Sequence, residues 1–294
     1  MSFVATCQPR ACPPAVTVGN KTMHFGDRAY IMGVVNVTPD SFSDGGKFLD
    51  HQHAIDHAMG MVDAGADIID IGGESTRPGA DPVDAQQEVE RVLPVIEGVR
   101  NQSDVWISVD TYKSAVAAAA ADAGADIIND ISGLGFDEDL ADTVADTDTA
   151  LVLMHIRKTP KSMQKDIDYD DVVDDILGYF HTRVQRAERA GISPERVILD
   201  PGIGFGKTVE QNYRLLRELN TFAQLGHPLL VGTSRKSFIG AVIDKPPQKR
   251  LWGTAATVAC SLLTGADIVR VHDVEQMADV VRTAEAIAAM GGPG

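Results

Sequence analysis

Cysteine, basic residues and long apolar runs are all scarce in this sequence. The three cysteines, Cys7, Cys12 and Cys260, are too few for a disulfide scaffold in 294 residues and favour a reduced, cytoplasmic location. Lys and Arg number 26 against 42 Asp and Glu, and a net charge of −16 argues against a nucleic-acid partner. No apolar run reaches the roughly 18 residues of a membrane span. Residues 1–14 lack the pattern of a signal peptide. We therefore expect a protein without a membrane or nucleic-acid partner.

Short apolar runs recur along the chain, and helical stretches lie between them. The eight runs cover residues 30–36, 67–71, 105–110, 126–129, 150–154, 196–200, 228–232 and 267–271. They are rich in β-branched residues and nearly continuous in hydrophobicity, which is typical of buried parallel strands. The intervening pattern predicts helices that include 83–100, 113–123, 169–190 and 274–290.

An internal repeat supports this alternation. The segments 64–70, 123–129 and 264–270 share a Gly-Ala-Asp-Ile pattern, in which the Gly can end a helix and the Asp-Ile can begin a strand. A doubly wound open sheet has the same local pattern, and a length near two times ~150 residues would allow two domains. The strand count favours an α/β protein of the (β/α)8 TIM-barrel class, and no linker divides it. We expect a single barrel domain at 29–292, preceded by an N-terminal extension, cap or hairpin at 1–28.

Polar side chains stand at the ends of these apolar runs, where a barrel carries its chemistry. They are Asn36, Asp70, Asp110, Asn129, His155, Asp200, residues 234–236, Arg270 and His272. Any one of them could be a turn former or a helix cap. Together they bring acceptors that suit a heterocycle with N–H and NH2 groups, and cations that suit an oxyanion such as phosphate.

One segment has the outline of a phosphate-binding loop. Residues 201–208 end in Gly206-Lys207-Thr208. A phosphate loop would need Gly five residues before Gly206, and Pro201 stands there instead. We therefore do not expect a nucleotide site.

The motifs at the strand ends, taken in order, resemble those of the dihydropteroate synthase family. They are Gly33–Gly46, Asp70–Gly79, Ile107–Thr111, Ile128–Ile131, Asp200–Lys207, Gly232–Ser237 and Arg270–Asp273, and the match runs from Tyr30 to His272. Members of this family join 6-hydroxymethyl-7,8-dihydropterin pyrophosphate to 4-aminobenzoate in folate synthesis, releasing pyrophosphate. The resemblance therefore implies a transferase.

The resemblance also implies roles for individual residues. The pterin pyrophosphate would contact Asn36, Thr76, Asp110, Asn129, Ile131, Met154, Asp200, Lys236, Arg270 and His272. The aminobenzoate would contact Phe42, Thr76, Pro78, Phe205, Ser234 and Arg235. Asp110, Lys236, Arg270 and His272 would be catalytic, and Asn36 would be a ligand of Mg2+. Family members are usually homodimers. The sequence departs from the family at Ile156, where Met is common, and at Lys158, where a Gly or small residue is common.

Two alternatives share the barrel. A pterin-binding methyltransferase would lack the Ser-Arg-Lys-Ser segment at 234–237 and the loop at 38–42, both of which are present. A non-catalytic pterin-binding protein would lack the pyrophosphate residues, yet Asn36, Arg270 and His272 are all present. The sequence therefore favours the synthase.

Overall fold

Eight parallel strands form a closed barrel at the centre of the molecule. The computed structural model describes residues 12–38, 47–76, 79–165 and 167–290. The barrel strands are β3 (Tyr30–Asn36), β4 (Ile68–Gly72), β5 (Trp106–Asp110), β6 (Ile127–Asp130), β7 (Ala150–Met154), β8 (Val197–Asp200), β9 (Leu230–Val231) and β10 (Ile268–Val271). The strands from β3 to β8 pair in chain order, β9 pairs with β10, and β10 also pairs with β3. A parallel bridge between Leu199 and Leu229 completes the ring. The prediction of a barrel, rather than of an open sheet, is confirmed.

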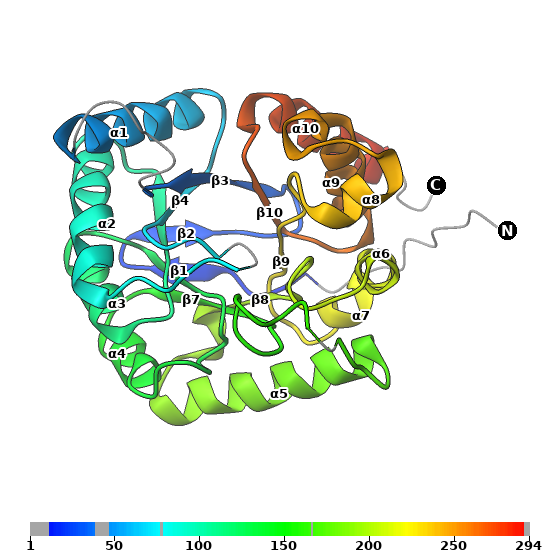
Figure 1. Ribbon diagram of the computed structural model, residues 1–294, viewed down its shortest axis with the longest axis horizontal. Helices are drawn as coiled ribbons and strands as arrows, with labels where there is room; N and C mark the ends of the chain where they lie inside the picture. Colours follow the sequence, from blue (N-terminus) through cyan, green and yellow to red (C-terminus); the bar gives the residue numbers. More distant parts are fainter. Residues whose placement is uncertain (1–11, 39–46, 77–78, 166, 291–294) are drawn as a thin grey trace, which may run out of the picture.

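Helices surround the barrel in chain order, from blue at the top left of Figure 1, through green, to red at the top right. They are α1 (Lys47–Asp63), α2 (Ala85–Arg100), α3 (Ser114–Asp122), α4 (Leu140–Asp146), α5 (Val172–Ala190), α6 (Val209–Arg217), α7 (Leu219–Ala223), α8 (Ser237–Ile243), α9 (Leu251–Thr264) and α10 (Val274–Met290). In the part of the chain that the structure describes, no helix is long and apolar enough to cross a membrane.

Capping residues determine where α2 and α5 begin. The prediction for α10 is confirmed at both ends, whereas α2 and α5 begin at 85 and 172 rather than at 83 and 169. Asp84 and Asp171 precede these two helices in extended conformation and accept N–H groups of the first turn. An aspartate in this position satisfies donors that have no partner within the helix, so the helix starts after it.

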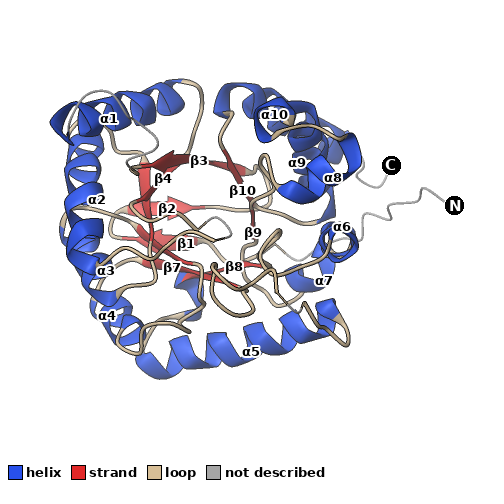
Figure 2. Cartoon of the chain, in the orientation of Figure 1, coloured by secondary structure: helices blue, strands red, loops and turns tan. Residues whose placement is uncertain are grey.

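A hairpin covers the N-terminal end of the barrel, as expected for the segment before the first barrel strand. Its strands, β1 (Val16–Val18) and β2 (Lys21–Met23), pair in antiparallel fashion and lie across the middle of the ring in Figure 2. Val16, Val18 and Met23 pack against inward-facing apolar side chains of the barrel strands. Because this end is filled, a substrate has to enter from the opposite end, where the strands finish.

The internal repeat ends a helix and attaches the next strand to the strand before it. Its glycines have left-handed backbones, with φ of 102° at Gly65, 99° at Gly124 and 121° at Gly265. Its aspartates each accept a backbone N–H of, or next to, the preceding strand: Asp67 from Ile31 at 2.9 Å, Asp126 from Ile107 at 2.8 Å and Asp267 from Leu229 at 2.7 Å. Each repeat thus turns the chain out of a helix and fixes the new strand to its neighbour.

Alternation along the strands makes the barrel interior apolar at one end and polar at the other. Side chains of a strand point alternately to its two faces. The inward positions near the hairpin are apolar, whereas those nearer the strand ends include the buried Asp70, Ser108, Asp110 and Asn129. Strand register places Gly72 between Asn36 and Asp110, and Asp110 opposite Asn129. The runs looked uniformly hydrophobic in sequence because their outward residues contact the helices.

Candidate active site

An arginine held by two carboxylates lies at the centre of the barrel mouth. Arg270 of β10 donates from Nε to Asp70 Oδ2 at 2.6 Å and from Nη2 to Asp110 Oδ2 at 2.9 Å. Asp70 is fully buried and also accepts from Ser108 Oγ at 2.6 Å and from Asn129 Nδ2 at 3.2 Å. One network therefore joins the predicted pyrophosphate residue Arg270 to the predicted pterin residues Asp110 and Asn129.

Burial brings the titration of this site close to neutral pH. Removal from water raises the pKa of Asp110 to about 7, although the positive charge of Arg270 acts in the opposite direction. Burial also raises the pKa of Asp200, whose carboxylate is attracted to Lys236. A carboxylate that burial makes costly to ionise gains most when a ligand supplies N–H donors.

Lys236 lies beside this network, in the segment that follows β9, and a Cβ at Gly232 would lie 3.7 Å from Lys236 Nζ and 3.6 Å from Arg270 Cβ. It precedes α8, its Nζ donates to the carbonyl of Ile203, and it lies 4.6 Å from the centroid of the Phe205 ring. A Cβ at Gly204 would lie only 2.8 Å from Lys236 Cδ, so the glycine makes room for the lysine stem. Burial lowers the pKa of Lys236 to about 8, and the charge of Asp200 opposes that shift.

A small apolar cluster forms one wall of the mouth, separate from the main core. It contains the predicted pterin residues Ile131 and Met154, together with Ile156 and Met163, and Phe205 packs against it. The departure from the family at Ile156 therefore keeps this wall apolar. Such a surface can cover the face of a flat heterocycle.

The predicted pyrophosphate residues occupy neighbouring strand ends. His272 donates its backbone N–H to Ser234 Oγ at 3.2 Å, and its Nδ1 lies 2.9 Å from the same hydroxyl. Because Oγ accepts the backbone proton, its own hydrogen is available to Nδ1, which favours the tautomer with N–H on Nε2. Asn36 is half-buried at the end of β3, and a Cβ at Gly72 would lie 3.9 Å from Asn36 Oδ1.

The remaining predicted residues are placed less centrally. Thr76 is half-buried in the loop after β4, whereas Phe42 and Pro78 lie outside the described residues. Arg235 is engaged by Asp273, with Nε to Oδ2 at 3.0 Å. Ser234, by contrast, is buried and contacts His272.

Lys158 lies away from this network. Its backbone is left-handed, with φ of 66°, and its Nζ donates to the carbonyl of Lys165 at 2.6 Å. Glycine adopts this backbone conformation at no steric cost, so the position is one that favours glycine.

Three features went beyond the sequence prediction. His155 follows β7 but packs edge-on against Tyr179 of α5, with ring centroids 4.8 Å apart, so it does not join the other strand-end residues. Asp70 was noted only as a strand-end residue, yet it holds the central network. The alternation of Asp70 and Gly72 with apolar residues was the available signal. Lys113 forms ion pairs with Glu74 and Glu88, and no pattern in the sequence indicated these pairs.

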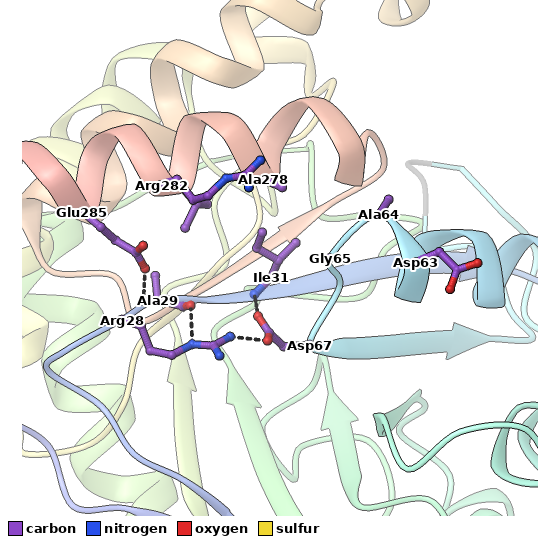
Figure 3. A pocket seen from close by; sticks show the side chains of 11 residues that line it. Arg28, Ala29, Ile31, Asp63, Ala64, Gly65, Asp67, Ala278, Arg282 and Glu285 are labelled. Atoms are coloured by element: carbon purple, nitrogen blue, oxygen red, sulfur yellow. Dashed lines mark hydrogen bonds and ion pairs between the residues drawn. The ribbon is translucent and has the colours of Figure 1, made fainter.

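A cleft of about 560 Å³ lies at the other end of the barrel, between the start of β3, the end of α1 and α10. Three of its charged side chains are engaged, as Figure 3 shows: Arg28 binds Asp67, and Glu285 accepts the N–H of Ala29 at 2.7 Å. None of the predicted site residues lines it. The chemistry therefore lies at the mouth of the barrel, where the strands end.

The barrel and its mouth define the class of protein. Residues 32–272 match the family described as "Pterin binding enzyme". A dihydropteroate synthase of Synechocystis sp. is 50% identical over 276 residues, which span 94% of this chain and 96% of the relative.

Solved structures agree. The Yersinia pestis dihydropteroate synthase with a sulfonamide drug complex has a TM-score of 0.89 and 44% identity, covering 94% of this chain and 99% of that one. The Xanthomonas albilineans enzyme with 4-aminobenzoic acid has a TM-score of 0.88 and 41% identity over the same shares of the two chains. The chain belongs to the dihydropteroate synthase family, whose members are transferases of folate biosynthesis.

Proposed function

We propose that the protein condenses 6-hydroxymethyl-7,8-dihydropterin pyrophosphate with 4-aminobenzoate to give 7,8-dihydropteroate and pyrophosphate. The observation that carries this function is the arrangement of Asp70, Asp110 and Arg270, in which buried acceptors for a heterocycle adjoin a cation for an oxyanion. The substrate has these two parts linked through one carbon, so both can be bound at once.

The pterin would lie in the barrel mouth. Its adjacent N–H donors suit the carboxylates of Asp110 and Asp200, and Asn129 and Lys236 supply further polar contacts. Ile131 and Met154 would cover the faces of the ring, since they belong to the apolar wall. These residues bind and orient the carbon at which substitution occurs.

The pyrophosphate would lie against Asn36, Arg270 and His272, with Thr76 beside it. A single amide ligand suits Mg2+ that arrives with phosphate oxygens, because Mg2+ usually keeps several waters and few protein ligands. We propose that Asn36 holds this ion, although no cluster of three acidic, His or Cys side chains lies in the described part of the chain. When bound, Mg2+ neutralises charge on the leaving group. Arg270 and His272 stabilise the same charge from the protein side.

The aminobenzoate would lie at the rim, against Thr76, Phe205, Ser234 and Arg235, with Phe42 and Pro78 assigned from the family alone. Its neutral amine attacks the carbon that carries the pyrophosphate. The carbon–nitrogen bond forms, the carbon–oxygen bond breaks, and the amine loses a proton. No nucleophilic side chain is needed, because the amine is itself the nucleophile.

We also propose that the protein is a cytoplasmic homodimer. Two large apolar side chains on adjacent helices support a partner surface: Val242 of α8 is 64% exposed and Trp252 of α9 is 77% exposed. The location rests on the few cysteines of the sequence, which carry no disulfide framework.

Release of pyrophosphate that depends on 4-aminobenzoate tests the function. The synthase releases one pyrophosphate for each dihydropteroate formed. A methyltransferase would instead transfer a methyl group from a folate, and a non-catalytic protein would bind the pterin substrate without turnover. Either result would overturn the proposal.

The metal role makes a separate prediction. Excess chelator should abolish pyrophosphate release, and added Mg2+ should restore it, because the leaving group then regains its counter-charge. Asn36→Ala should raise the Mg2+ concentration needed for half-maximal activity. Full activity in excess chelator would contradict the assignment.

A further inference from the structure

The loop that resembles a phosphate loop has the opposite polarity. In a phosphate loop, backbone N–H groups converge on an anion. In the loop 201–207, backbone carbonyls converge on a cation: Lys207 Nζ donates to the carbonyls of Gly202 at 2.8 Å and Phe205 at 2.9 Å. A third bond runs to His155 Nδ1 at 3.0 Å. An ammonium group has three N–H donors, so Lys207 is fully satisfied inside the protein.

Burying the charged side chain of Lys207 costs free energy, because the ammonium group is removed from water. The side chain is only 4% exposed, and its three close partners are all neutral. Burial accordingly lowers the pKa of Lys207 to about 7, although the charge of Asp200 opposes that shift. A methionine would fill a buried position of this shape without the cost of desolvating a charge.

The loop around Lys207 connects to several proposed substrate residues. Lys207 binds the carbonyls of Gly202 and Phe205. The carbonyl of Ile203, which lies between these two residues in the sequence, accepts a hydrogen bond from Lys236 Nζ. The N–H of Gly202 donates to Asp200 Oδ1 at 2.7 Å, and Phe205 presents its ring to Lys236. Two hydrogen bonds of Lys207 thus end in the same segment that contacts Asp200 and Lys236 and carries Phe205.

Three glycines give this loop its backbone shape. Gly202, Gly204 and Gly206 all have positive φ, at 67°, 86° and 60°. A Cβ at Gly202 would overlap the carbonyl oxygen of His155, so the β7 and β8 loops touch directly there. Three left-handed residues in one short loop give little intrinsic rigidity, because glycine restricts the backbone least.

We propose that Lys207 is a positioning residue of the synthase: its ammonium group holds the 201–207 loop so that Asp200 and Lys236 are aligned to bind the pterin. This inference rests on the proposed pterin roles of Asp200 and Lys236. It gives a function to the Gly-Lys-Thr motif that the phosphate-loop interpretation left without one.

Lys207→Met tests the proposal, with Lys165→Met as the control because Lys165 is exposed. Two binding measurements are made by calorimetry on the full chain, one with 6-hydroxymethylpterin and one with inorganic pyrophosphate and Mg2+. We expect Lys207→Met to bind the pterin at least about 10-fold more weakly, which is the lower range for a charged hydrogen bond. Pyrophosphate binding should stay within about twofold of the unmodified chain, since Arg270 and His272 lie on β10 and its following loop. The KM for the pterin substrate should rise correspondingly.

Two results would overturn the positioning role: unchanged pterin binding, or equal losses of pterin and pyrophosphate binding together with a lower melting temperature. The second result would show a purely structural lysine. If Lys207→Met does not fold, Lys207→Gln is measured in the same way, because its amide offers two N–H donors to the same carbonyls. Failure of the unmodified chain to bind pterin would instead overturn the proposed function, so the two failures are distinguishable.

Discussion

At the scale of single residues, the barrel mouth depends on charged side chains that partner one another. Arg270 spans Asp70 and Asp110, whereas Asp200 faces Lys236 at close enough range to oppose the shift that burial imposes on the lysine pKa. Substrate therefore exchanges one set of partners for another rather than entering an uncharged pocket. The affinity for substrate reflects the difference between the two sets.

Replacing Lys236 tests the assignment of one such partner. Lys236→Ala should lower kcat/KM for the pterin substrate roughly 10- to 150-fold, the effect expected for a lost hydrogen bond to a charged group. The circular dichroism spectrum should be unchanged, because the lysine stem packs at the mouth rather than in the core. Lys249→Ala, at an exposed lysine, is the matched control. An unfolded Lys236→Ala protein would show that the lysine is structural.

The pH dependence of the free enzyme should be a narrow bell. Asp110 has to be ionised to accept N–H groups, and burial raises its pKa to about 7, so kcat/KM for the pterin substrate should rise with pH through that value. Lys236 has to be protonated to donate, and burial lowers its pKa to about 8, so activity should fall above it. Asp110→Asn should flatten the acid limb as well as lowering the maximum. An unaltered acid limb in that variant would assign the titration to another group.

The same shift has a consequence for stability. The pKa of an unfolded aspartate is about 3.9, below the folded value, so the folded protein retains a proton that the unfolded chain has released. The contribution of Asp110 to stability is therefore present at low pH and is lost as the pH rises through about 7. Asp110→Asn should gain stability relative to the unmodified chain across this window. Urea denaturation at pH 5 and pH 8 measures the difference.

At the scale of elements, a half-buried lysine ties the loop after β4 to two helices. Lys113, which precedes α3, donates to Glu74 Oε2 at 2.6 Å and to Glu88 of α2. Glu74 also accepts from Tyr112 at 2.8 Å and from the backbone N–H of Val83 at 2.9 Å. The carboxylate thus fixes the base of the loop that carries Thr76.

Removing that lysine should leave two carboxylates facing each other in the interior. Lys113→Met should lower the free energy of unfolding by about 3–5 kcal/mol, the usual effect of breaking a buried ion pair. Burial already raises the pKa of Glu88, and losing Lys113 should raise it further. The folded variant then takes up a proton as the pH falls, so its deficit should be smaller at pH 5 than at pH 8. Glu88→Gln on the same background should recover part of the loss, and a deficit that does not vary with pH would contradict this account.

The elements themselves were largely predictable, because strand and helix periods are local properties of sequence. The run 30–36 became β3 without change, but 228–232 formed only the two-residue strand β9. Pro228 has no N–H to donate to a neighbouring strand. Gly232 lies just after the end of the strand, and Arg270 and Lys236 pack close to it. A Cβ at Gly232 would lie 3.6 Å from Arg270 Cβ and 3.7 Å from Lys236 Nζ.

The pairings inside the site were not predictable in the same way. Parallel strands end at one edge, so the sequence predicts which residues gather at the mouth. It does not predict that Arg270 bonds Asp110, 160 residues earlier, or that Lys207 bonds His155, 52 residues earlier. Such contacts depend on side-chain directions and on the space that neighbouring glycines leave.

At the scale of the whole molecule, the proposed binding regions for the two substrates share side-chain contacts. Ser234, assigned to aminobenzoate, bonds the pyrophosphate residue His272 at 2.9 Å. Phe205, also assigned to aminobenzoate, packs under the pterin residue Lys236. Occupation of the first region therefore changes the contacts that shape the second, which is the physical basis of coupling between two sites.

We expect this coupling to make binding ordered, with pterin pyrophosphate first and aminobenzoate second. Pterin and pyrophosphate would hold Lys236 and His272 in one arrangement, so that the ordering of Phe205 and Ser234 precedes the arrival of aminobenzoate. A coupling free energy of about 1–3 kcal/mol corresponds to roughly 5- to 150-fold tighter binding of aminobenzoate when pterin, pyrophosphate and Mg2+ are present. Calorimetric titration of aminobenzoate, with and without these ligands, measures the ratio directly. Ser234→Ala should reduce the ratio, because it breaks the link between His272 and the aminobenzoate region. Equal affinities in the two titrations of the unmodified chain would show that the second site is already formed and that the shared contacts carry no coupling.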